Sequence, residues 1–303
     1  MPRDDREIAV SRPAKVFYPE SGVTKGDVVE HFRLVAEVMV PHLRGRPLSL
    51  RRFPDGITDE GFFQKEVPDH FPDWIDVADI PRRREEKGTS HYVVCSDAAS
   101  LVYLANQAVL EFHIWPSRVG ALDKPDLMVI DIDPPDGKQV GELRSVARRA
   151  RDVFLALGLE PFVQATGGRG FHVVAPLDPS TGYDTVRQLA REIADLLALL
   201  DSDRLTTAIR KDRRGNRIFL DTNRNGYAQT FIAPYSTRAR PGAPVAVPLD
   251  WGELGKAEPN GWDLTRLRRR LARKTDPWAD IYQHAVSAEA ARDRLIELTA
   301  PRA

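Results

Sequence analysis

Three aspartates stand at the ends of apolar segments, where a folded chain would bring them to the edge of a sheet. Asp131 and Asp133 close the run 127–133, and Asp221 closes the run 217–221. Residues two apart on a strand face the same side, so the carboxylates of Asp131 and Asp133 would be neighbours that repel each other. A hard divalent cation relieves such repulsion. The set predicts a two-metal site for phosphoryl or nucleotidyl transfer; the alternative is that turns and solvent satisfy the three acids.

A glycine-rich turn supplies a second candidate, for an anion. Residues 166–170 read Thr-Gly-Gly-Arg-Gly, and His172 follows at the start of an apolar run. Glycines allow backbone N–H groups to converge on one point, while Arg169 adds charge and Thr166 adds a hydroxyl donor. Taken alone, the pattern fits an ordinary hairpin turn equally well.

Further cationic residues could complete a nucleotide site. Arg238 and Arg240 alternate, so an extended backbone would point both guanidinium groups to one side, as binding of a triphosphate requires. Arg217 ends a basic run over 210–217 that could follow phosphates, and His113 lies between apolar residues. The alternatives are, in the same order, a solvated strand face, a surface loop and a buried core histidine.

Aromatic and basic residues before position 66 could bind nucleic acid, because base stacking beside phosphate contacts needs that combination. The candidates are Lys15, Lys25, Arg52, Phe62, Phe63 and Lys65. A hydrophobic core would explain the paired phenylalanines, and solvation would explain the lysines.

Hydrophobic periodicity indicates the elements that must position these residues. Helices are predicted where apolar residues recur every three or four positions, over 25–40, 139–157, 183–200, 263–274 and 287–298. Strands are predicted over 48–53, 91–95, 127–132, 161–164, 171–175, 217–220 and 230–232. Thr24 is the expected N-cap of the first helix and Pro41 its expected end. Asn225-Gly226 predicts a hairpin between 218–221 and 228–232, and the mixture predicts an α+β fold with largely antiparallel sheet.

Composition sets the broad class of the protein. The 303 residues include 44 Lys+Arg and 44 Asp+Glu, so the net charge is zero and only local clustering of charge could favour nucleic acid. The single cysteine, Cys95, excludes an internal disulfide and an all-cysteine zinc site. No apolar run approaches the roughly 18 residues that span a membrane. We therefore expect a cytoplasmic protein with one domain over 1–303 and loose ends at 1–10 and 299–303.

Together the motifs resemble the polymerase module of bacterial ligase D, in the archaeo-eukaryotic primase superfamily. The similarity runs from Lys15 to about Trp251. The segments that carry it are 62–65, 111–118, 131–134, the turn that ends in His172, Asp221 and the long stretch 233–251.

The resemblance implies a primase-polymerase fold, with an RRM-like antiparallel catalytic sheet flanked by helices. It also implies template-dependent nucleotidyl transfer to a primer 3′-OH with two Mn²⁺ or Mg²⁺ ions, NTPs or dNTPs as substrates and ribonucleotides preferred. The metal ligands would be Asp131, Asp133 and Asp221. The nucleotide would be held by His113, Thr166, Arg169, His172, Arg217, Arg238 and Arg240. Lys15 and Lys25 would bind a 5′-phosphate, and Phe62 and Phe63 would stack on the template.

The expected setting is repair or end joining in the bacterial cytoplasm, at the nucleoid. The partners would be DNA with gaps or ends that carry a 5′-phosphate, a DNA ligase and an end-binding protein, and the protein would be a monomer. Departures from the family are Thr166 for Ser, Arg169 for Lys, and Thr222–Asn225 in place of Trp-x-Gln-Asn. A non-catalytic DNA-end binding protein and a metal phosphohydrolase stay open as alternatives.

Overall fold

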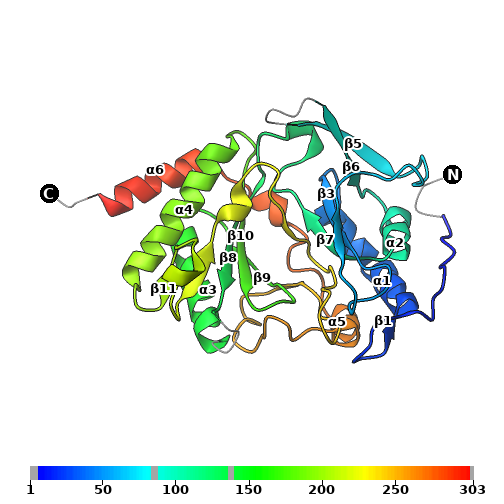
Figure 1. Ribbon diagram of the computed structural model, residues 1–303. Helices are drawn as coiled ribbons and strands as arrows, with labels where there is room; N and C mark the ends of the chain where they lie inside the picture. The colour runs from blue at the N-terminus through cyan, green and yellow to red at the C-terminus, as the bar shows by residue number, and fades with distance from the viewer. Residues whose placement is uncertain (1–5, 83–87, 136–139, 301–303) are drawn as a thin grey trace. The chain divides into compact units, whose positions relative to one another are not determined.

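The computed structural model describes residues 6–82, 88–135 and 140–300, and the chain folds into two compact units (Figure 1). Unit 1 comprises Met1–Trp115, Thr230–Val247 and Trp262–Asp276. Unit 2 comprises Pro116–Gln229, Pro248–Gly261 and Pro277–Ala303. Both units are discontinuous in sequence, which explains why no linker-like segment marks a boundary. The single domain expected over 1–303 stays a prediction.

Unit 2 is built on a sheet with the strand order β11-β12-β8-β10-β9-β14. Its strands are β8 (Leu127–Asp133), β9 (Phe162–Ala165), β10 (Phe171–Pro176), β11 (Leu205–Thr206), β12 (Ile218–Asp221) and β14 (Val247–Leu249). β8 pairs antiparallel with both β10 and β12, while β11 and β12 are parallel. The predicted α+β fold with largely antiparallel sheet is confirmed.

Helices α3 (Val140–Ala156) and α4 (Tyr183–Leu200) pack on this sheet, and α6 (Ala288–Thr299) packs on α4 (Figure 1). Their apolar positions recur at helical spacing, and side chains such as Phe154, Leu189 and Ile193 are fully buried. The bounds of α4 match the prediction. The predicted start of α3 at Gln139 lies outside the described residues.

Unit 1 holds a sheet with the order β13-β7-β3-β4 and two strand pairs, β1-β2 and β5-β6. The strands are β1 (Val16–Tyr18), β2 (Val23–Thr24), β3 (Leu48–Arg52), β4 (Phe62–Gln64), β5 (Asp76–Pro81), β6 (Thr89–Val94), β7 (Val109–Ile114) and β13 (Phe231–Ile232). The helices are α1 (Lys25–Leu43), α2 (Ala98–Asn106) and α5 (Leu264–Leu271). Periodicity did not predict α2 because most residues of the helix are themselves apolar and buried. No polar face marks the helical period in its sequence.

Helix α1 begins as predicted but ends later. Thr24 Oγ1 accepts the Asp27 N–H, and the Asp27 carboxylate accepts the Thr24 N–H, which completes a capping box. The prediction that Pro41 ends the helix was wrong, because the helix runs on to Leu43. Proline removes its own N–H bond but leaves the residues after it free to stay helical, and the turn arrives only at Gly45, with φ of 71°.

The predicted hairpin at Asn225-Gly226 was also wrong. β12 lies in the sheet of unit 2, whereas β13 lies in the sheet of unit 1. Asn225 ends the short 3₁₀ helix η4 (Asn223–Asn225), and its side chain is fully buried. Its amide accepts the Val129 N–H at 2.8 Å and donates to the Val129 carbonyl at 2.7 Å. Asn225 therefore satisfies the edge of β8 as a further strand residue would.

The ends predicted to be loose are described in part. Residues 1–5 and 301–303 lie outside the described residues, 6–10 have no regular structure, and α6 continues to Thr299. Among the described helices, none is both long and apolar enough to cross a bilayer.

Candidate functional site

A row of polar side chains crosses three neighbouring strands of unit 2. Asp131 on β8 is the cross-strand partner of Asp221 on β12 and of His172 on β10. Directly paired residues share a face of the sheet, so these three side chains lie side by side. His172 is 4% exposed, and its Nε2 lies 3.6 Å from Asp131 Oδ1. The row continues to the buried Gln164 on β9, which pairs with His172.

Asp133 lies on the same face as Asp131, two residues along β8, as the spacing predicted. Its pKa is raised by burial and by the neighbouring charges of Asp131 and Asp221, and Arg169 and His172 oppose that rise. The Arg169 guanidinium lies 3.9 Å from the Asp133 carboxylate. The carboxylates of Asp131, Asp133 and Asp221 therefore repel each other. A bound cation would relieve this repulsion.

Asp221 has two roles. Its Oδ1 accepts hydrogen bonds from the backbone N–H and the side-chain amide of Asn223, at 2.8 and 2.7 Å, so it caps a turn. It also faces Asp131 across the ladder. Within residues 6–82, 88–135 and 140–300, no three His, Cys, Asp or Glu side chains already surround one point as metal ligands. The donor set fits hard divalent cations in its chemistry, but rotation of these carboxylates would be needed to surround an ion.

The glycine-rich turn joins β9 to β10, as predicted, and its donors are used within unit 2. Thr166 Oγ1 donates to the Gly170 carbonyl at 2.8 Å and accepts the Gly168 N–H at 3.2 Å. Gly167 N–H donates to the Pro259 carbonyl at 2.8 Å. The structure thus uses Thr166 to close the turn. The Arg169 side chain reaches back over the end of β8 and donates to the Pro135 carbonyl at 3.3 Å.

Gly170 is fixed by a close approach of two backbones. A Cβ at this position would lie 2.0 Å from the Ile132 carbonyl oxygen, closer than real atoms come. Only glycine lets β10 pair with β8 here, and this pairing sets His172 beside Asp131.

Arg217 lies in a loop, and its guanidinium group binds backbone carbonyls there. Its Nε and two terminal nitrogens donate to the carbonyls of Arg214, Ser202 and Arg213. The structure places it among these carbonyls, and its assignment to the nucleotide stays a prediction.

A second polar cluster lies in unit 1 around Glu111, on one face of the sheet β13-β7-β3-β4. Glu111 and His113 are two apart on β7, and Arg51 on β3 is the cross-strand partner of Glu111. Phe63 on β4 pairs with Arg51, and its ring centroid lies 5.5 Å from that of His113. Arg238 reaches the same carboxylate. His113 is therefore neither a plain core residue nor isolated.

Arg238 and Arg240 differ in their surroundings. Arg240 N–H donates to the Arg238 carbonyl at 2.8 Å, so the backbone bends between them. The prediction of an extended segment that points both side chains the same way was wrong on this point. Arg238 is held by Glu111, whereas Arg240 is exposed.

The two phenylalanines of β4 are exposed, by 48% for Phe62 and 57% for Phe63, so they are not core residues. As successive strand residues they face opposite sides of the sheet. Phe62 pairs with Arg52, whose guanidinium lies 5.6 Å from the ring centroid and donates to Gln64 Oε1 at 2.6 Å. Lys65 is exposed directly after them. Only Phe63 shares the face of the Glu111 cluster.

Lys15 and Lys25 lie together at the start of α1. The Lys25 N–H donates to the Lys15 carbonyl at 2.7 Å, and Lys25 Nζ donates to Ser11 Oγ at 2.7 Å. Burial lowers the pKa of Lys25, and the charges of Arg12 and Lys15 lower it further. The N–H groups at the start of the helix are already bonded, because the carbonyls of Lys15 and Pro13 and the hydroxyl of Thr24 accept them. Any anion held here would therefore depend on the lysine side chains.

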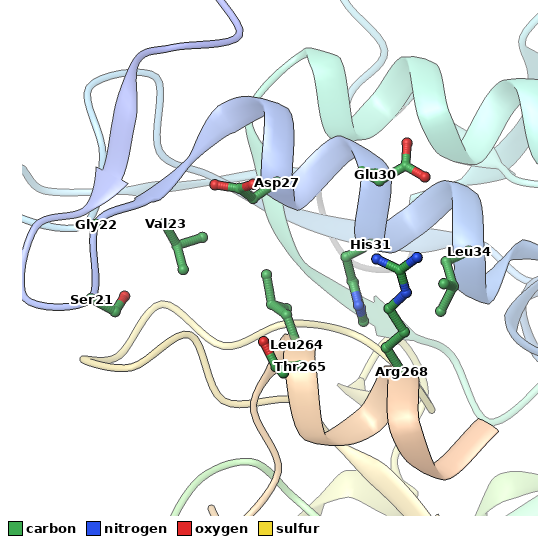
Figure 2. A pocket seen from close by; sticks show the side chains of 10 residues that line it. All are labelled: Ser21, Gly22, Val23, Asp27, Glu30, His31, Leu34, Leu264, Thr265 and Arg268. Atoms are coloured by element: carbon green, nitrogen blue, oxygen red, sulfur yellow. The ribbon is translucent and has the colours of Figure 1, made fainter. Parts of the chain in front are cut away.

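A hollow of about 380 Å³ lies between α1 and α5 of unit 1 (Figure 2). His31 and Leu34 of α1 face Leu264 and Arg268 of α5 across it. None of the predicted site residues lines it. Its buried His31 donates through Nε2 to the carbonyl of Tyr235 at 2.9 Å, so this wall supports the chain segment that leads to Arg238.

Three residues of these clusters were not predicted, namely Arg51, Glu111 and Gln164. Glu111 is 2% exposed and Gln164 is fully buried, and each is flanked by apolar residues in the sequence. The signal for Glu111 was its spacing of two from His113, which puts both on one strand face. Gln164 could be found only from the pairing of β9 with β10, which is a tertiary property.

Known proteins match most of this chain. A family model described as "LigD, primase-polymerase domain" matches residues 24–278. The LigD end-joining protein of Mycolicibacterium smegmatis is 33% identical over 253 residues, which is 83% of this chain and 33% of that protein. The LigD protein of Pseudomonas aeruginosa is 31% identical over 278 residues, or 90% of this chain and 32% of that protein. The chain thus spans about a third of the length of these relatives.

A solved structure shares the fold. The polymerase domain of ligase D from Mycobacterium tuberculosis, in complex with DNA, matches with a TM-score of 0.85 and 30% identity, over 93% of this chain and 100% of that one. The expected resemblance and fold are confirmed by these matches.

Proposed function

The chain belongs to the LigD primase-polymerase domain family, and on this premise we propose that it extends the 3′-OH of a primer, under direction of a template, at gaps or broken ends of DNA. A primase-polymerase transfers nucleotidyl groups, so membership places the chain in that class of enzyme. The observation that carries the proposal is the row Asp221–Asp131–His172 across three strands, with Asp133 beside it.

Asp131, Asp133 and Asp221 would hold two Mn²⁺ or Mg²⁺ ions. Such ions activate the attacking 3′-OH and neutralise the pyrophosphate that leaves. The raised pKa of Asp133 supports this assignment, because burial and then the charges of Asp131 and Asp221 disfavour its ionised form, which a metal ion would favour. The three acids also argue against a purely DNA-binding protein, which has no need of them.

The chain's own cations would bind and orient the nucleotide. Arg169 lies beside Asp133 in unit 2, and Arg238 and His113 are held in unit 1. Guanidinium groups bind phosphate oxygens through paired N–H donors. This composition favours a triphosphate substrate over the simple phosphodiester of a nuclease.

The biological setting would be repair or end joining, and the longer relatives are named after end joining. The partners would be a ligase and an end-binding protein. Preference for ribonucleotides is part of the proposal.

The decisive experiment is extension of a labelled primer on a gapped, 5′-phosphorylated duplex, with Mn²⁺ and with NTPs or dNTPs in separate reactions. We expect templated addition, faster with NTPs, that is absent from the Asp131→Ala/Asp133→Ala variant. Retention of the DNA without extension would indicate an end-binding protein, and shortening of the primer would indicate a phosphohydrolase.

A further inference from the structure

We propose that Glu111 is a positioning residue that fixes His113 and Arg238 relative to each other for binding the nucleotide. The inference rests on the proposed function, since it assigns a task to the residues expected to hold the triphosphate. Its structural basis lies within unit 1 alone.

One carboxylate binds groups from three separate parts of the chain. Glu111 Oε2 accepts from His113 Nε2 at 3.0 Å. Glu111 Oε1 accepts from Arg238 Nε at 3.2 Å and from the Ala239 N–H at 3.0 Å, and Arg51 lies 3.6 Å away. His113 and Arg51 come from strands β7 and β3, whereas Arg238 and Ala239 follow β13. Glu111 is thus the common partner of all four.

The carboxylate is ionised in the folded protein. Burial would raise its pKa, but the hydrogen bond from His113, the charge of Arg238 and the Ala239 N–H outweigh burial and hold the pKa well below its ordinary value. A buried charge with partners of opposite sign orients them strongly, because leaving it unpaired would be costly. Arg51 and Arg238 together exceed the charge of Glu111, so the cluster can still attract an anion.

The segment that carries Arg238 is held at each of the three residues before it. Tyr235 has a positive φ of 66°, and its OH donates to Asp276 Oδ1 at 2.7 Å. Ser236 Oγ accepts the Phe112 N–H at 2.9 Å, and Thr237 Oγ1 donates to the Leu110 carbonyl. The Arg238 carbonyl accepts from Tyr18 OH at 3.1 Å. With this backbone fixed, the contact with Glu111 helps to orient the guanidinium group.

Contact through Nε fits a positioning role. Nε is the inner nitrogen of the guanidinium group, and binding it to a fixed carboxylate sets the plane of the group. Fixing the arginine before the nucleotide arrives reduces the entropy lost on binding. Loss of Glu111 should therefore weaken nucleotide binding without removing a group that touches the nucleotide.

The test is a double-mutant cycle on the full chain, read by ATP binding in the presence of Mn²⁺ and by the KM for ATP in primer extension. We expect Arg238→Ala to weaken binding roughly 10- to 150-fold, as loss of a charge-assisted contact does. Glu111→Gln should weaken it about tenfold, mainly in KM and little in kcat. In the double variant the two effects should combine to clearly less than their product, since part of the effect of Glu111 acts through Arg238.

The matched control is Glu192→Gln, which removes another arginine-bound carboxylate, the partner of Arg292 in unit 2, and should leave ATP binding unchanged. Effects of Glu111→Gln and Arg238→Ala that multiply in the double variant would overturn the proposal, and so would normal binding by Glu111→Gln. If Glu111→Gln does not fold, the cycle of His113→Ala with Arg238→Ala decides, because the intact Glu111 should couple them and independent effects would refute it. Absence of extension with normal ATP binding would instead count against the proposed function.

Discussion

At the residue scale, the most informative feature is the crowding of acids in unit 2. Asp131 faces Asp221 across the ladder, and Asp133 lies beside them with a raised pKa. Stability of the sheet alone would favour apolar residues at such half-buried positions. The arrangement therefore supports the proposed cation site.

This assignment predicts the effect of removing one acid. Asp131→Ala or Asp221→Ala should reduce nucleotide addition by more than the roughly 10- to 100-fold that is typical when a group behind a metal ligand is lost. DNA binding should stay close to normal, because no lysine or arginine side chain is removed. Primer extension and anisotropy titrations with gapped DNA measure the two effects, and Asp203→Ala, at an exposed acid, is the control. Near-normal extension by either variant would remove the metal assignment.

At the element scale, the sequence predicted best those elements whose pattern is local. Strands β8, β9, β10 and β12 follow from short apolar runs and helix α4 from its period, whereas the short strands β11 and β14 were not predicted. The capping box of α1 follows from Thr24 and Asp27. Pairings between distant strands could not be predicted, so the row from Asp221 to His172 was seen only as separate motifs. Asn225-Gly226 misled because a buried asparagine bound to Val129 has the same local sequence as a hairpin turn.

The close approach at Gly170 gives a prediction about strand pairing. Gly170→Ala should destabilise the protein by about 1–3 kcal/mol, as forced overpacking does, because its Cβ would meet the Ile132 carbonyl at 2.0 Å. It should also reduce extension, since His172 and Asp131 depend on this pairing. Urea unfolding measures the first effect. The control is Gly141→Ala in α3, where a Cβ meets nothing within 4 Å and stability should rise by up to about 1 kcal/mol. Equal stability of the two variants would contradict the steric argument.

Helix α1 carries a pH-dependent term in stability. Burial lowers the pKa of His31 to about 4, against the backbone hydrogen bond with Tyr235. The folded state therefore binds fewer protons than the unfolded state between about pH 6.5 and 4, and stability is lost as pH falls through that window. Between pH 7.5 and 5 the loss from this group should be about 2 kcal/mol.

The comparison that isolates this term is wild type against His31→Gln, whose amide can still donate to the Tyr235 carbonyl. Urea unfolding at both pH values should show a smaller loss of stability in the variant than in the wild type. The same loss in both proteins would show that other groups cause the acid sensitivity.

At the scale of the whole molecule, the net charge is zero. Attraction of DNA must therefore come from local concentrations of positive charge. Lys15 and Lys25, with Arg12 beside them, form one such concentration at the start of α1. Lys25 is only 6% exposed and donates to Ser11, so it is not an ordinary solvated lysine. Asp55 binds Lys15 Nζ at 2.5 Å and is the one anion recorded on these two ammonium groups among the described residues.

This arrangement predicts the choice of DNA substrate. If the two lysines bind a terminal phosphate, the protein should bind a gap with a 5′-phosphate more tightly than a gap with a 5′-hydroxyl. The added contact should steepen the decrease of affinity with salt by about 0.9 for each phosphate neutralised. Lys15→Ala/Lys25→Ala should remove the preference. Asp55→Asn should strengthen it, because Asp55 competes with the phosphate for Lys15.

Titrations of each protein with the two DNAs at several salt concentrations measure all three effects. Equal affinity of the wild type for both DNAs would end the assignment, whereas a preference that persists in the double variant would place the phosphate pocket at other residues.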